Sequence, residues 1–336
     1  MKFAVLCQTT IRDFITGVRT FTKECHNTGV CDLYLLSTIG SLDDDEYKTV
    51  QKLYTSEEYS GTIVSTCLYE TDNMDIIDSF PHPRILYLHE WSSLKHGNWR
   101  FIDKIDIIAY DRPLLAKSFI DRYPSFDKPY RELTLPYLFK GEKNGEHYEK
   151  NIISLTRIAP NKHFLEVYDA AAELPSFNFH IAGVKYKTTE EGGEYFERIK
   201  LLLSGLDNVH WYGELTNKEI VNCLSNSEYY LGLTSDTSGW QTYGIEYAAM
   251  EAMDAGCIPI VNSEMEYEYR RQGARAIFWN SSSTSAPLAR LIRNCYDGGS
   301  YLRSYIVPHN YEFLRRKNIR FRNQLELMVK EYIGGL

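Results

Sequence analysis

Two stretches in the second half of the chain combine charged side chains with the signals of a helix start. In "SLTRIAPNKHFLEVYDAA" an apolar strand is expected to end near Leu155, and Arg157 follows it. Pro160 stops further extension, and Asn161 is the predicted cap of a helix whose first turn holds Lys162. A cation there opposes the helix dipole by a few tenths to about 1 kcal/mol, which a bound anion would relieve. The pattern predicts a diphosphate site, the alternative being that Lys162 points into water.

The second stretch, "TYGIEYAAMEAMDAGCIPIVNS", carries two carboxylates, Glu246 and Glu251, on a predicted alanine-rich helix. Five steps of about 100° put the two side chains roughly 140° apart, so they do not form one bidentate clamp. Each carboxylate needs its own partner, unless Glu246 only favours the helix start through the dipole. Small apolar residues recur at helical spacing and form one narrow stripe that packs closely: Ile245, Ala248, Ala249, Ala252, Met253 and Gly256.

Parallel α/β units are expected to position these side chains, because short apolar runs alternate with amphipathic stretches along the whole chain. The first series of predicted strands is "KFAVLCQ", "CDLYLLS", "GTIVSTCL", "RILYLHE", "IDIIAYD" and "LTLPYL". The second is "NIISL", "NFHIAGV", "VHWYGEL", "YYLGLTS", "CIPIVN" and "AIFWN". A polar segment at 141–150 is the predicted linker. The pattern favours two Rossmann-like domains, 1–145 and 150–309, that face a central cleft, followed by a helix at 310–336.

Composition narrows the class of protein. The chain has 336 residues, a formal charge of -8 and seven scattered cysteines without a C-x-x-C pair, which predicts free thiols in a reducing compartment. No apolar run is long enough for a signal peptide or a membrane span, so we expect a cytoplasmic protein without stable membrane insertion. The first half lacks the G-x-G-x-x-G fingerprint of an NAD enzyme. "DDDE" at 43–46 follows no apolar strand, which favours a solvated loop over a metal site.

The second-half motifs resemble those of retaining glycosyltransferases with the GT-B fold. In that family an Arg and a Lys at the spacing of Arg157 and Lys162 hold the diphosphate of a nucleotide sugar. A helix preceded by a glycine, here Gly244, carries a Glu that binds the ribose, and "EAMDAGCIPIV" places Glu251 at that position. The resemblance implies a GT-B fold, a nucleotide-sugar donor such as a UDP-sugar, and neither a cofactor nor an essential metal.

One departure from the family pattern narrows the resemblance. The common motif has two Glu residues eight positions apart, but eight positions before Glu251 stands Tyr243. Glu246 gives an E-x4-E spacing instead, which is similar to bacteriophage α-glucosyltransferases that modify hydroxymethylcytosine in DNA. That similarity implies that Glu246 lies near the donor sugar or phosphates.

The first half contributes weaker parallels to the same phage enzymes. "RILYLHEWSSL" ends a predicted strand in His89 and Glu90, so that His89 would bind the donor sugar and Glu90 would orient or deprotonate the acceptor hydroxyl. The alternative for His89 is a structural role. Gly17 and Val18 stand where the fold usually has a loop close to the acceptor and the phosphates.

One dense cationic run, "LRRKNIRFR", lies near the end of the chain. Its residues Arg315, Arg316, Lys317 and Arg320 are candidates for contacts with the phosphates of DNA, although a solvated helix face is the plainer interpretation.

The resemblance implies a retaining, metal-independent hexosyl- or pentosyltransferase whose acceptor is 5-hydroxymethylcytosine in double-stranded phage DNA, acting in the host cytoplasm. It also implies that the helix at 310–336 packs back on the first domain. Two alternatives stay open. One is a bacterial glycosyltransferase for surface polysaccharide or glycolipid, and the other is a non-catalytic module that binds a sugar nucleotide or nucleic acid. The residues do not distinguish between donor sugars, nucleotide bases, linkage positions or oligomeric states.

Overall fold

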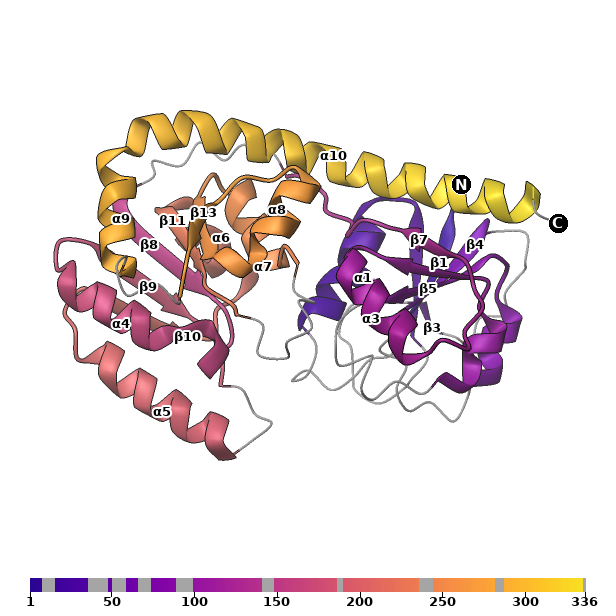
Figure 1. Ribbon diagram of the computed structural model, residues 1–336, viewed down its shortest axis with the longest axis horizontal. Coiled ribbons are helices and arrows are strands. Elements are labelled where there is room, and N and C mark those ends of the chain that lie inside the picture. Colours follow the sequence, from indigo (N-terminus) through magenta and orange to yellow (C-terminus); the bar gives the residue numbers. More distant parts are fainter. Residues whose placement is uncertain are drawn as a thin grey trace. The chain divides into compact units, whose positions relative to one another are not determined.

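The chain forms two compact units, each built around its own parallel sheet (Figure 1). Unit 1 consists chiefly of Met1–Leu138 and Arg315–Leu336, and unit 2 of Phe139–Gly239 and Gly244–Leu314. The computed structural model describes residues 1–7, 16–35, 48–49, 59–65, 74–88, 99–140, 148–185, 190–235, 244–281 and 287–334.

Unit 2 begins before the predicted domain start at residue 150. The ring of Phe139 lies 5.4 Å from that of Tyr311 and packs against the core of unit 2. The next residue, Lys140, donates its backbone N–H to Asp254 at 3.1 Å. Residues 139 and 140 are therefore held by side chains of unit 2, although their sequence carries no strand or helix pattern.

The sheet of unit 1 has seven parallel strands in the order β3-β2-β1-β4-β5-β6-β7. Helices α1 (Thr16–Asn27) and α3 (Pro113–Arg122) and the 3-10 helices η1 (Met74–Ser79) and η2 (Trp99–Lys104) accompany it. The strands are β1 (Phe3–Cys7), β2 (Cys31–Leu35), β3 (Lys48–Thr49), β4 (Gly61–Ser65), β5 (Arg84–Leu88), β6 (Ile107–Tyr110) and β7 (Tyr130–Glu132).

The predicted strand "LTLPYL" at 133–138 is not a strand. The last strand of the sheet ends at Glu132, and the chain continues without regular structure through residue 140. Pro136 has no N–H to give to a sheet ladder. The N–H of Leu133 still goes to the carbonyl of Tyr110 at 2.7 Å, but the N–H of Thr134 goes to the side chain of Gln324 at 2.8 Å, so the sheet ladder does not continue.

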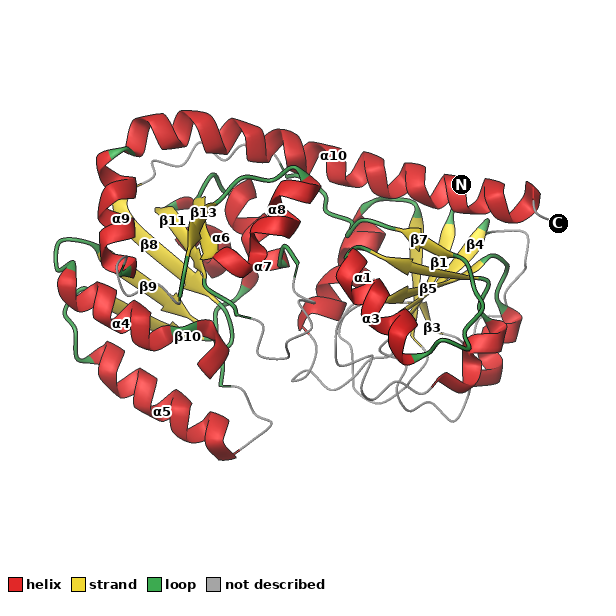
Figure 2. Ribbon diagram, in the orientation of Figure 1, coloured by secondary structure: helices red, strands yellow, loops and turns green. Residues whose placement is uncertain are grey.

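The sheet of unit 2 has six parallel strands in the order β10-β9-β8-β11-β12-β13 (Figure 2). They are β8 (Tyr148–Leu155), β9 (Asn178–Ala182), β10 (Val209–Gly213), β11 (Ser227–Gly232), β12 (Ile258–Asn262) and β13 (Ile277–Trp279). The order reverses between β8 and β11, and in such sheets ligands bind outside the carboxyl ends of the strands at that reversal. The helices are α4 (Phe164–Glu173), α5 (Glu190–Ser204), α6 (Asn217–Ser225), α7 (Tyr247–Asp254), α8 (Glu266–Gln272) and α9 (Leu288–Asp297), with the 3-10 helices η3 (Pro160–Lys162) and η4 (Ser263–Met265).

The sheet of unit 2 has two covered faces, and the residues of β11 alternate between them. Tyr229 and Leu231 face one side and join a buried apolar cluster with α4, α5, α9 and part of α10. Tyr230 and Gly232 face the opposite side because side chains alternate along a strand. That opposite side of the sheet is the one that carries the candidate site.

The last helix, α10 (Gly299–Gly334), has 36 residues and contributes to both units (Figure 1). It begins earlier than the predicted helix at 310, because Ile306 and Val307 already pack in the core of unit 2. The exposed Pro308 is accommodated inside it. Its later part packs on unit 1, where Arg320 donates to Glu132 at 2.7 Å and Arg131 donates to Glu331 at 2.6 Å.

Candidate functional site

The connection after β8 carries Lys162 to the carboxyl edge of the unit 2 sheet. Lys162 ends the 3-10 helix η3, and α4 begins only at Phe164. The prediction that Asn161 caps this helix is wrong, since His163 stands at the cap with a left-handed φ of 56°. Asn161 instead accepts the N–H of Ser235 at 2.9 Å and donates its side-chain amide to the carbonyl of Ser235. These two hydrogen bonds fix the segment of Lys162 against the loop that follows β11.

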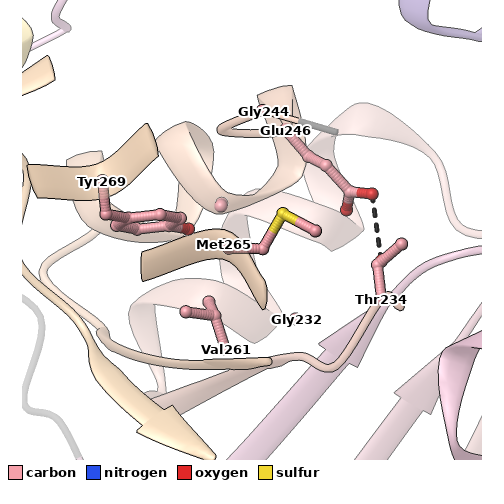
Figure 3. Close-up of a pocket in the computed structure, with 8 residues that line it drawn as sticks. Gly232, Thr234, Gly244, Glu246, Val261, Met265 and Tyr269 are labelled. Atoms are coloured by element: carbon pink, nitrogen blue, oxygen red, sulfur yellow. Dashed lines mark hydrogen bonds between the residues drawn. The ribbon is translucent and has the colours of Figure 1, made fainter. Parts of the chain in front are cut away.

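Three side chains from three segments meet at this edge. The Lys162 ammonium donates to Thr234 Oγ1 at 2.5 Å and to Glu246 Oε1 at 2.9 Å. Thr234 donates to the same Glu246 oxygen at 3.0 Å (Figure 3). Lys162 follows β8 and Thr234 follows β11, so the network lies at the reversal of strand order. The structure thus brings together Lys162 and Glu246, which are 84 residues apart.

The network is buried on one side and accessible on the other. The Lys162 side chain is 9 % exposed, whereas that of Glu246 is 33 % exposed. Burial raises the pKa of Glu246. The Lys162 ammonium, the Thr234 hydroxyl and the charge of Arg157 together lower it by more than burial raises it, so the pKa lies below its ordinary value. Glu246 is therefore ionised at neutral pH, and a buried ammonium faces an accessible carboxylate.

Helix α7 places the two predicted carboxylates differently from the sequence expectation. Glu246 is the residue before the helix, with extended backbone angles, and Tyr247 is the first helical residue. The Glu246 side chain caps no backbone N–H of α7, because it is bonded to Lys162 and Thr234. Glu251 lies inside the helix and is partly exposed. The carboxylate of Glu251 is close enough to Tyr230 to raise the pKa of that hydroxyl, after burial and Glu246.

Two further predicted donor residues lie near the network. Gly244 lines a small pocket together with Glu246. Arg157 is exposed, and its charge helps to lower the pKa of Glu246. The shared pocket places Gly244 beside Glu246, and the effect on the pKa places Arg157 near the same carboxylate.

The predicted site residues of unit 1 are Gly17, Val18, His89 and Glu90. Gly17 and Val18 belong to the first turn of α1 rather than to a loop, because that helix already begins at Thr16. His89 and Glu90 lie outside the residues that the structure describes, directly after β5. Their roles stay predictions.

The cationic run on α10 is only partly available to an anion. Lys317 is 3 % exposed and donates to Thr134 Oγ1 at 3.3 Å, so the expectation that it meets DNA is wrong. Lys317 lies on the buried face of α10, together with Leu314 and Phe321. Arg320 forms an ion pair with Glu132, and Arg315 and Arg316 are exposed.

Sequence reasoning missed Thr234, the residue that joins the other two members of the network. Its signal was present, because "YYLGLTS" ends a buried strand in two hydroxyl residues. Polar side chains at the carboxyl end of a parallel strand are typical of a binding site. The pairing of Thr234 with Lys162 depends on β8 and β11 being neighbours in the sheet, which the sequence pattern does not give.

The described part of the chain carries neither a membrane-spanning helix nor a cluster of metal-ligating side chains. None of its helices has the length and apolar character needed to cross a membrane. Its His, Cys, Asp and Glu side chains form no group of three or more with the arrangement of a metal site.

Comparison with known proteins gives a family match for part of the chain and a fold for the whole of it. Residues 139–296 match the family described as Glycosyl transferases group 1. Those residues include every strand and helix that builds the Lys162 network. A search of the curated proteins by sequence found no match.

Solved structures resemble the chain over nearly its whole length. An alpha-glucosyltransferase in complex with UDP-glucose and DNA containing an abasic site has a TM-score of 0.72 at 14 % identity, covering 97 % of this chain and 99 % of that chain. An alpha-glucosyltransferase bound to UDP and a 13-mer DNA containing a HMU base has a TM-score of 0.71 at 13 % identity, with 97 % and 98 % covered. Anabaena HepE in complex with UDP has a TM-score of 0.67 at 10 % identity, with 98 % and 100 % covered. The chain has the GT-B fold of two Rossmann-like domains, as its sequence motifs predict.

Proposed function

We propose that this protein is a retaining glycosyltransferase that uses a UDP-sugar. The GT-B fold and the match of residues 139–296 to the family Glycosyl transferases group 1 support the proposal. The observation that carries the proposal is the Lys162 ammonium, buried at the reversal of strand order and bonded to Thr234 and Glu246. A cation fixed at that position is suited to an anionic leaving group.

The proposed roles follow the chemistry of the leaving diphosphate. Lys162 and Arg157 neutralise the charge that develops on it, which is the kind of stabilisation that usually dominates such reactions. Glu246 lies near the sugar, and Glu251 holds the ribose hydroxyls. Gly244 lets the donor approach the start of α7.

The proposed transfer balances without a cofactor or a metal. The bond between the anomeric carbon and the diphosphate oxygen breaks, and a bond from the acceptor oxygen forms on the same face of the sugar. The acceptor hydroxyl gives its proton to the departing diphosphate. The two cationic side chains supply the charge that a divalent metal supplies elsewhere.

For the acceptor we propose 5-hydroxymethylcytosine in double-stranded DNA, acted on in the cytoplasm. Two of the similar structures contain DNA, which supports this choice for a chain with the same fold. The base must leave the duplex for its hydroxymethyl group to react. His89 and Glu90 are proposed to meet the sugar and the acceptor hydroxyl, Gly17 and Val18 to lie near them, and Arg315, Arg316 and Arg320 to contact DNA phosphates.

A glycan or glycolipid acceptor is the second candidate. It is favoured by the comparable similarity to HepE, whose structure is described as a complex with UDP. The acidic net charge of -8 also suits a polyanion less well than a neutral glycan.

One incubation separates these acceptors. Duplex DNA containing hydroxymethylcytosine, and the same duplex with plain cytosine, are each treated with the protein and a panel of UDP-sugars, then analysed as nucleosides by mass spectrometry. We expect a mass gain of one sugar on hydroxymethylcytosine alone. If no donor gives a mass gain, the DNA acceptor is refuted and glycan acceptors are next.

A further inference from the structure

His163 joins the segment of Lys162 to helix α4 through an uncommon backbone conformation. It follows η3 and precedes α4, and its φ of 56° and ψ of 41° lie in the left-handed region. The N–H of His163 goes to the Pro160 carbonyl at 3.4 Å, and the His163 carbonyl accepts from the N–H of Val167 at 3.2 Å. A residue with a Cβ atom keeps this conformation only where its surroundings hold it. Such a residue directly follows the lysine of the candidate site.

Two contacts of the His163 side chain hold that conformation. The Nδ1 atom lies 3.0 Å from Glu166 Oε1, and the ring meets that of Trp279 edge to face, with the centroids 5.1 Å apart. The hydrogen bond with His163 lowers the pKa of Glu166 by more than burial raises it, so the carboxylate is ionised and accepts from Nδ1–H. The Nε2 atom is buried and has no hydrogen-bond partner among the residues that the structure describes. Glu166 is therefore the polar anchor of the imidazole.

The left-handed turn decides where Lys162 points. With helical backbone angles at His163, η3 would run on into α4 and the lysine would lie in the first turn of that helix, where its charge opposes the helix dipole. The turn instead leaves Lys162 outside α4, where the ammonium donates to Thr234 and Glu246. The His163 side chain is only 16 % exposed, and its own contacts lie on α4 and β13. The imidazole thus acts on the Lys162 network through the backbone.

We propose that His163 is a positioning residue for the leaving diphosphate. Its side chain, held by Glu166 and Trp279, stabilises the turn that directs the Lys162 ammonium to the carboxyl end of the sheet. The inference rests on the proposed function, because it takes Lys162 as the cation that meets the diphosphate of a UDP-sugar. The imidazole does not touch the donor, and its loss weakens donor binding because the lysine is no longer held in one direction.

Two substitutions at residue 163 separate the backbone from the side chain, with the Kd for UDP measured by calorimetry. Glycine adopts the left-handed conformation without strain, so His163→Gly should keep the Kd within about threefold of the wild type. A β-branched residue disfavours positive φ, so His163→Val should raise the Kd about tenfold. An imidazole that contacted the donor directly would make the glycine variant as weak as the valine variant, and that result would overturn the proposal.

A double-mutant cycle keeps the test independent of any folding defect at residue 163. Glu166→Ala removes the polar anchor and should raise the Kd for UDP about fivefold while Lys162 is present. In the Lys162→Ala background the same change should alter the Kd by less than about twofold, because the anchor acts through the lysine. Equal changes in both backgrounds, or no change in either, would refute the positioning role.

The matched control is the start of α6, which is also held by two side chains three residues apart. Thr216 and Glu219 form a capping box there, and Thr216 Oγ1 donates to Glu219 at 2.6 Å. Glu219→Ala should lower the free energy of unfolding and leave the Kd for UDP unchanged, since α6 carries no member of the Lys162 network.

The control also separates this inference from the proposed function. A Kd raised equally by Glu219→Ala and Glu166→Ala would reflect a general loss of stability and would overturn the role of His163. Normal UDP binding by the wild type with no coupling in the cycle would refute His163 alone and leave the donor site standing. If UDP fails to bind the wild type, the proposed function falls, and this inference with it.

Discussion

The two sheets of this protein share the order of their first six strands, yet each unit has a buried polar network at a different edge. In unit 1, Asp32 accepts from Tyr59 at 2.6 Å and pairs with Lys2 at 2.7 Å, and Tyr34 contacts Tyr59 at 2.8 Å. Lys2 precedes β1 and Tyr59 precedes β4, so these side chains lie at the amino ends of the strands. In unit 2 the network lies at the carboxyl ends, where Lys162 and Thr234 follow their strands.

Each network has one charged side chain that reaches solvent, which in unit 1 is Lys2, 49 % exposed. Asp32, Tyr34 and Tyr59 are all less than a tenth exposed. Glu246 of unit 2 is one-third exposed and lines a pocket. The accessible charge of unit 2, Glu246, lies at the carboxyl ends of the strands and lines a pocket, which suits that network to a ligand. The difference lies in which strand ends carry the charged side chains.

The largest expected effect comes from Arg157→Ala in unit 2. Removing a cation that stabilises the leaving diphosphate should lower kcat by about 10²- to 10³-fold. The matched control in unit 1 is Arg131→Ala, since Arg131 is also partly exposed and pairs with Glu331. Steady-state kinetics should find near-wild-type turnover for the control, with both variants folded. Normal turnover of Arg157→Ala would remove this residue from the donor site.

An intermediate effect is expected from paired threonine variants. Thr234→Val keeps the side-chain shape but takes a hydrogen bond from Lys162, which should raise the Kd for UDP about tenfold, or about 1.4 kcal/mol. Thr62 of unit 1 is fully buried and donates to the Pro81 carbonyl at 2.7 Å. Thr62→Val should lower the free energy of unfolding by about 1 kcal/mol and leave UDP binding unchanged. Equal Kd changes in both variants, measured by calorimetry, would erase the contrast between the units.

The smallest effect is the share of the pH dependence of stability that comes from Glu246. The folded-state pKa of Glu246 lies below its ordinary 4.5, because Lys162 and Thr234 outweigh the effect of burial. A lowered carboxyl pKa contributes stability above the unfolded pKa, and that part is lost as the pH falls through the folded value. The wild type should therefore lose stability relative to Glu246→Gln as the pH is lowered below 4.5. Denaturant unfolding at several pH values measures this, and a constant difference down to strong acid would contradict the ion pair.

Local patterns in the sequence were sufficient to predict most strands of both sheets. Apolar runs such as "CIPIVN" and "IDIIAYD" became β12 and β6, because burial on both faces favours continuous apolar residues. "LTLPYL" failed because its proline and its tie to Gln324 outweigh its apolar pattern. The start of α4 failed because His163 adopts a left-handed backbone conformation that no residue type in the stretch signals.

The candidate site was predictable in its members but not in its connections. Lys162 and Glu246 were identified from separate motifs, yet their ion pair depends on β8 and β11 being neighbours in the sheet. Thr234 joins them only because β11 ends beside β8. The burial of Lys317 depends likewise on where α10 packs, which the charge pattern alone does not encode.

The most direct measurement of the central claim is a crystal structure of the protein with UDP. We expect an oxygen of the diphosphate within hydrogen-bonding distance of the Lys162 ammonium, at about 2.7–2.9 Å. UDP bound away from the carboxyl ends of β8 and β11, with the Lys162, Thr234 and Glu246 contacts unchanged, would contradict the account.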